Sequence, residues 1–134
     1  MTDINQGILG TRRTMATIAV RNIEIARHFY QDILGLVPTG ANQPGVLTFA
    51  SADTMVIVYE SQYAGSNKAT AATWVVDRDG DIAQIVAALK EKDVVFEHYD
   101  FPDTFREGDV HVSGNLKAAW FKDPDSNILS IVSQ

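Results

Sequence analysis

Two short stretches of this 134-residue chain follow one pattern: MATIAV at residues 15–20 and AATWVV at residues 71–76. Each stretch is mostly apolar and short, which is typical of a buried strand. They begin 56 residues apart, and three of their positions are identical: Ala16/Ala72, Thr17/Thr73 and Val20/Val76. Two such strands, one near the start of each half, indicate that the chain repeats a structural unit.

The repeat continues in the segments that follow these strands. Asn22 is suited to cap a helix that runs to Leu34, and Gly35 is suited to end it. A small, polar stretch at 61–70 is the best linker in the chain. The other expected elements are strands at 46–51 and 55–61, a helix at 80–92, a strand at 94–101, a long loop at 102–115, and strands at 117–122 and 128–132.

Later positions of the two halves also match in order. Phe49 corresponds to Phe121, and the triplet at 56–58 corresponds to the triplet at 129–131. Chance similarity between short apolar runs is the alternative, but chance does not explain matching order across whole halves. We therefore predict one α+β domain made of two modules. The modules span about 14–61 and 71–133, after an N-terminal arm at 1–13.

Composition excludes several classes of function. The chain has no cysteine, which removes disulfides, thiolate metal sites and thiol nucleophiles. The formal net charge is −6 and Arg12-Arg13 is the only basic pair, so nucleic acid is not an expected partner. The sequence shows neither a secretory signal nor an apolar run long enough for a membrane span. We expect a cytoplasmic protein that does not bind membranes.

Two motifs carry a resemblance to a known family. The segment 19–30 leads through Phe29-Tyr30 to Leu34-Gly35-Leu36, and WFKDPDSN occupies 120–127. Together they resemble the vicinal oxygen chelate superfamily, which includes glyoxalase I, bleomycin and fosfomycin resistance proteins, and extradiol dioxygenases. The resemblance spans residues 15–133 and implies two βαβββ modules whose curved mixed sheet surrounds a cleft, with helices on the outer face. Ser126 replaces the usual glycine, where a left-handed backbone costs serine about 1 kcal/mol.

Metal-dependent relatives carry one ligand on the first and last strand of each module. By resemblance, these four positions fall on Met15, Ile57, Ala71 and Ser130. None of them offers an imidazole nitrogen or a carboxylate oxygen, so we predict no cofactor. Glu60 would reach the cleft only through a β-bulge. A divalent metal enters only under an alternative hypothesis, with Glu60, His98 and His111 as its candidate ligands.

The three histidines are expected in different parts of the fold. His28 belongs to the polar face of the first helix. Either His98 or its neighbours Glu97 and Tyr99 face the cleft, and strand alternation does not choose between them. His111 belongs to the long loop, which is either a lid over the cleft or a solvated loop. Glu97 and His111 are the candidate general bases if the chain is an enzyme.

Strand alternation assigns an uncharged set of residues to the cleft. The residues expected to bind a ligand are Met15, Thr17, Ile57, Tyr59, Ala71, Thr73, Trp120 and Ser130. This lining suits a planar or apolar small molecule. The alternative is that these side chains fill the space themselves or pack against a second subunit.

Three hypotheses about function follow. The first is a metal-free member of the family that binds a small organic molecule by sequestration or carriage. The second is a glyoxalase-type lyase or isomerase, or a dioxygenase, that uses a non-standard metal or general base. The third is a non-catalytic interaction module whose cleft is a dimer interface. The resemblance implies a homodimer, and modules could pair within one chain or between two.

Overall fold

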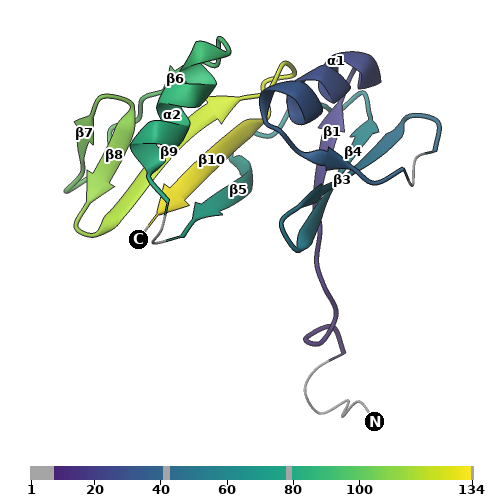
Figure 1. Ribbon diagram of the computed structural model, residues 1–134, viewed down its shortest axis with the longest axis horizontal. Helices are drawn as coiled ribbons and strands as arrows, with labels where there is room; N and C mark the ends of the chain where they lie inside the picture. The colour runs from purple at the N-terminus through teal and green to yellow at the C-terminus, as the bar shows by residue number, and fades with distance from the viewer. Residues whose placement is uncertain (1–7, 41–42, 78–79, 134) are drawn as a thin grey trace.

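The computed structural model describes residues 8–40, 43–77 and 80–133. The first module forms a four-stranded sheet with the order β1-β4-β3-β2 (Figure 1). Its first strand runs parallel to its last, as a βαβββ unit requires. The strands are β1 (Ala16–Val20), β2 (Val37–Pro38), β3 (Val46–Ser51) and β4 (Thr54–Glu60).

The second module repeats this plan. In its sheet the strand order is β5-β10-β9-β8-β7, β6 also pairs with β9, and β5 runs parallel to β10. The helix α2 (Ile82–Glu91) follows the first strand. The strands are β5 (Thr70–Val76), β6 (Phe96–Glu97), β7 (Phe105–Glu107), β8 (Val110–Ser113), β9 (Leu116–Lys122) and β10 (Ile128–Ser133). The predicted α+β class and the repeated module are confirmed.

The first helix begins as predicted but does not continue as one regular helix. The side chain of Asn22 accepts hydrogen bonds from the backbone N–H groups of Glu24 and Ile25, which caps α1 (Ile23–Arg27). From His28 the helix widens into the π-helical segment η2 (His28–Ile33), where Leu34 N–H donates to Phe29 O. Gly35 then ends it with φ +81°.

Two expectations for the second module are wrong. The predicted strand at 94–101 is reduced to β6, which has two residues. The predicted loop at 102–115 contains the hairpin β7–β8, which turns at Gly108 with φ +64°. Val110 and Val112 are buried on either side of His111, so their alternation is the strand pattern that the sequence interpretation missed.

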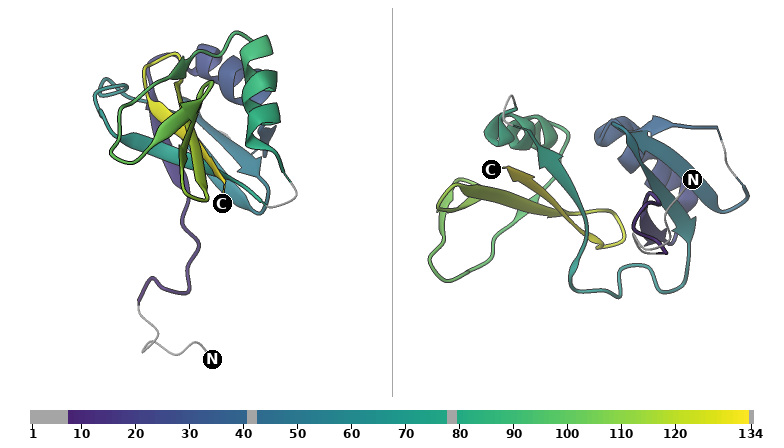
Figure 2. Two further views of the ribbon diagram at one scale, coloured as in Figure 1. Left: turned by 90° about the vertical axis from the view of Figure 1, so that its left-hand side faces the viewer. Right: turned by 90° about the horizontal axis from the view of Figure 1, so that it is seen from below.

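Each sheet is covered by helices on one side only. Figure 2 shows the helices of both modules on one side of the molecule. The core lies beneath them and contains alternate residues of the strands, such as Ile18, Val20, Val58, Phe121 and Leu129. The remaining strand residues point to the other side, which we call the open face. No helix in the described ranges is long and apolar enough to cross a membrane.

The turn at 123–127 joins the two modules. Tyr30 Oη donates to the buried carboxylate of Asp123 at 2.7 Å, and Asn127 Nδ2 donates to Ala19 O at 2.7 Å. Burial, reinforced by the Asp123 carboxylate, raises the pKa of Tyr30 above its ordinary value. Ser126 adopts φ +71°, as expected for the position where the family motif has glycine. We call these contacts the module seam.

Candidate functional site

The four positions that would ligate a metal all lie on the open face or just before it. Met15 precedes β1, and Ile57 in β4 is paired with Thr17 of β1. Ala71 lies in β5, and Ser130 in β10 is paired with Thr73 of β5, to which it is hydrogen-bonded at 2.7 Å between hydroxyl oxygens.

The donor chemistry of these positions does not fit a divalent metal. Methionine sulfur, two aliphatic side chains and one neutral hydroxyl lack the imidazole or carboxylate groups that such ions need. Among the described residues, no group of three or more histidine, aspartate and glutamate side chains could hold an ion elsewhere. The described residues at these four positions therefore do not fit a divalent metal ion.

Glu60 lies away from the open face. The register between β1 and β4 runs without a shift from Ala16/Val56 to Val20/Glu60, so no bulge rotates Glu60. Strand alternation places it on the same side as buried Val58, at the end of β4. Glu60 belongs to the first module, whereas the two other candidate ligands, His98 and His111, belong to the second.

The structure resolves which residues of the 97–99 segment face inward. Glu97 is paired with Trp120 in register and forms an ion pair with Lys122 at 3.2 Å. Tyr99 packs edge-on against the Trp120 ring, with centroids 5.4 Å apart. These contacts place Glu97 and Tyr99 with Trp120 on the open face.

His98 takes part in a polar network at the periphery. Its Nε2 is 2.7 Å from Asp109 Oδ1, and Lys90 Nζ is 2.7 Å from the other oxygen of that carboxylate. Hydrogen bonds from Lys90 and His98 hold the pKa of Asp109 below its ordinary value. The network links α2 to the β7–β8 hairpin. His28 is exposed on η2 beside Asp32, as its place on the helix predicts.

His111 is the one histidine of the open face. It is paired with Ala118 in register and is only 3% exposed. Its Nε2 accepts a hydrogen bond from the backbone N–H of Tyr99 at 2.9 Å. Its ring lies 4.9 Å from Trp120 and 6.4 Å from His98, centroid to centroid. Because Asp109 and Arg106 bind His98 instead, the described residues give His111 no charged partner.

The eight predicted ligand-binding residues share the open face. In the second sheet, Trp120, Ser130 and Thr73 form one row across β9, β10 and β5. In the first sheet, Thr17 and Ile57 form a similar row. Met15 lies two residues before Thr17 and Tyr59 two residues after Ile57, and both have much of their surface exposed. Trp120 Nε1 donates to Thr70 Oγ1 at 3.2 Å. The set carries no charged side chain.

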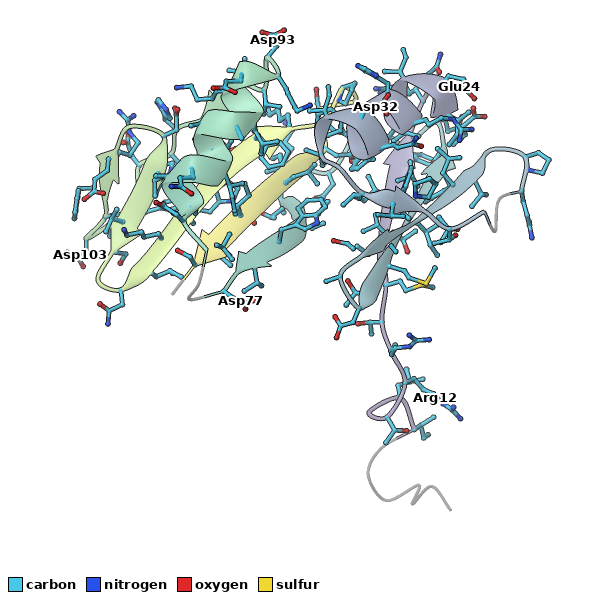
Figure 3. All side chains as sticks on the ribbon, viewed as in Figure 1. Arg12, Glu24, Asp32, Asp77, Asp93 and Asp103 are labelled. Carbon is cyan, nitrogen blue, oxygen red and sulfur yellow. The ribbon has the colours of Figure 1, made fainter. Side chains whose placement is uncertain are left out.

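Between the modules lies a slot that sequence analysis did not predict. Within the described part of the chain, β1 pairs only with β4 and β5 only with β10, so the two strands present free edges to each other. A cavity of about 480 Å³ between them is lined by Ala16, Thr73, Val75 and Asp77, among others. Asp77 marks the end of β5 in Figure 3. A second, largely apolar cavity of about 390 Å³ lies on the helix side.

Trp74 is the largest of the four residues that line both cavities; the others are Ser51, Ala52 and Val75. Its Nε1 donates to Ser51 Oγ at 3.1 Å, which fixes the indole across the slot. Sequence analysis assigned Trp74 to the strand pattern alone. The repeat offered a signal for this role, because Trp74 stands where the first half has the smaller Ile18. We call this region, from Ala16 and Ser51 to Trp74 and Val75, the module slot.

Comparison with solved structures reveals close likeness in fold despite low sequence identity. A glyoxalase/dioxygenase from Nostoc punctiforme superposes with a TM-score of 0.69 at 15% identity, over 96% of this chain and 94% of that one. A lactoylglutathione lyase from Agrobacterium tumefaciens gives 0.67 at 13%, over 92% and 93%. A fosfomycin resistance protein from Listeria monocytogenes gives 0.64 at 12%, over 92% and 91%. No family model and no curated protein matches the sequence.

These likenesses extend over nearly the whole of each chain, so both modules are matched. The chain therefore has the fold of these glyoxalase, dioxygenase and fosfomycin resistance proteins, which agrees with the resemblance carried by the two sequence motifs. At such low identity the likeness establishes the fold, and the chemistry of the site must be argued from its own residues.

Proposed function

We propose that the chain binds a small apolar or aromatic molecule on its open face, without the divalent metal typical of this fold. The observation that carries the proposal is the row Trp120–Ser130–Thr73. At the position where the family motif has a carboxylate, this chain has Ser130, whose hydroxyl is hydrogen-bonded to that of Thr73 and which is paired in register with Trp120. Such a row favours stacking and hydrogen bonding over metal chemistry.

The surroundings of this row suit a ligand of modest size. The module slot beside this row holds a cavity of about 480 Å³, in the range of small-molecule sites; it adjoins the row at Thr73, and its lining does not include Trp120. The indole of Trp120 offers a flat surface for a planar ring, and the hydroxyl groups can orient a polar substituent. The proteins of similar fold include two that are named for small molecules, lactoylglutathione and fosfomycin, which supports a small molecule as the class of ligand.

The two tryptophans of the chain provide a direct test with naphthalene as the probe. In Trp74→Phe, the remaining fluorescence comes from Trp120 on the open face; in Trp120→Phe, it comes from Trp74 in the module slot. We expect naphthalene to quench Trp120. We also expect Trp120→Ala to weaken naphthalene binding about tenfold, because a stacked aromatic pair is lost together with its buried area.

The control variant is Tyr63→Ala, which removes an exposed aromatic ring from the linker. It should leave naphthalene binding unchanged. Quenching of Trp74 alone would contradict the assignment to the open face and move the ligand into the module slot. A complete lack of binding would contradict the proposed function.

The open face also supports a second role, as the surface that meets another copy of the chain. Val75 is 71% exposed there, and Met15 and Tyr59 are also exposed. Apolar side chains gathered on one face are typical of an interface. A homodimer formed through this face would cover Trp120, so naphthalene and a second copy would compete. Sedimentation velocity during a naphthalene titration tests this second role. If naphthalene and a second copy compete for the open face, added naphthalene will shift the chain from dimer toward monomer.

A further inference from the structure

One polar atom of the open face is buried without a hydrogen-bond partner. His111 Nε2 accepts from the backbone N–H of Tyr99, so this nitrogen carries no proton of its own. The imidazole proton of the neutral ring therefore belongs to Nδ1. Among the described residues, nothing accepts a hydrogen bond from Nδ1. A buried donor without an acceptor has lost its hydrogen bonds to water without gaining one to the protein, which costs free energy.

The ring of His111 is enclosed by aromatic side chains. Trp120 meets it edge-on at 4.9 Å, Tyr99 lies roughly parallel at 6.2 Å, and Phe101 lies at 6.1 Å, all between ring centroids. Phe101 also packs on Trp120 at 5.4 Å but is itself 45% exposed. Phe101 is thus the outermost ring of this cluster.

Phe101 belongs to a segment outside the strands, between β6 and β7. The hydrogen bond from Tyr99 to His111 anchors the chain on one side, and β7 begins at Phe105 on the other. Between these points, the hydrogen bond from Thr104 to Pro102 is local. The Phe101 ring can therefore leave Trp120 while Tyr99 and His111 stay in place.

We propose that His111 Nδ1–H anchors the ligand of the open face, and that this ligand is a planar molecule with a neutral carbonyl oxygen. The ligand ring takes the place of Phe101 on Trp120, and its carbonyl oxygen accepts the proton that has no acceptor in the free protein. This inference rests on the proposed function and names its ligand class. Among the described residues, no carboxylate is hydrogen-bonded or ion-paired to His111, so Nδ1–H of the neutral ring favours an acceptor over a cation.

Two probes of similar size test the proposal: coumarin, which has a ring carbonyl, and naphthalene, which has none. For the native chain we expect coumarin to bind about fivefold to tenfold more tightly, the effect of one hydrogen bond to a buried donor. His111→Phe should abolish this preference and leave naphthalene binding in place. His98→Gln is the matched control, because it alters the neighbouring histidine and should keep the preference.

Nitrogen-15 NMR of the native chain gives a readout that does not depend on any variant folding. The Nδ1 resonance of His111 should shift with coumarin and stay unchanged with naphthalene. Equal affinity of coumarin for the native chain and His111→Phe, or an unmoved Nδ1 resonance, would overturn the proposal. If naphthalene still quenches Trp120 in that case, the proposed function survives. If neither probe binds, both fail.

Discussion

Replacing Asp123 with alanine is expected to lower the free energy of unfolding by about 4 kcal/mol, the cost of breaking a buried polar network from one side. The Asp123 carboxylate is buried and accepts hydrogen bonds from Tyr30 Oη, Asn127 Nδ2, and the backbone N–H groups of Asp125 and Asn127. Alanine would leave these donors without an acceptor. The hydrogen bond from Tyr30 crosses between the modules, and Asn127 Nδ2 also donates to Ala19 O across them.

Denaturant unfolding measures this loss of stability, and two further variants are compared with Asp123→Ala. Asp123→Asn preserves shape and one acceptor oxygen, so it should cost less than alanine. Asp100→Ala removes an exposed carboxylate and should change stability by less than about 0.5 kcal/mol. If Asp123→Ala unfolded no more easily than Asp100→Ala, the module seam would not be the network that holds the fold together.

Gly65→Ala is the second substitution with a large expected effect. Gly65 lies in the linker with φ +72°, and an added Cβ would overlap the backbone oxygen of Asp125. A backbone atom cannot move aside as a flexible side chain can, so the linker would have to separate from the turn at 123–127. We expect a loss of about 3 kcal/mol, from a left-handed alanine together with overpacking.

Gly108→Ala separates these two causes. Gly108 has φ +64° in the β7–β8 turn, and an added Cβ there meets nothing within 4 Å. Its substitution carries only the conformational cost, about 1 kcal/mol. Equal losses for Gly65→Ala and Gly108→Ala in thermal or denaturant unfolding would show that linker packing against the Asp125 turn is unimportant.

Local sequence signals predict much of this fold because they act within a few residues. Asn22 caps its helix through its own side chain, and Gly35 ends it because only glycine reaches that conformation at little cost. The repeat between 15–20 and 71–76 predicts the two modules because each half must bury the same strand-and-helix face. These features depend little on the rest of the chain.

The features that sequence missed depend on distant partners. The π-helical segment η2 places Phe29 against Phe121 of the other module, a contact that helix periodicity does not reveal. The role proposed for His111 depends on its contacts with Tyr99 and Trp120. These contacts form because His111 lies in a hairpin that the sequence interpretation treated as a loop. Trp74 lines the module slot because two free strand edges meet there.

The central claim is that the four positions Met15, Ile57, Ala71 and Ser130 offer no usable metal ligands, and metal content tests it most directly. The chain is purified without chelator, dialysed separately against Zn²⁺, Ni²⁺, Mn²⁺ and Fe²⁺, and analysed for bound metal. With methionine, isoleucine, alanine and serine at the four positions, we predict far less than one equivalent of any ion per chain. One full equivalent of a single metal, held through further dialysis, would contradict the account.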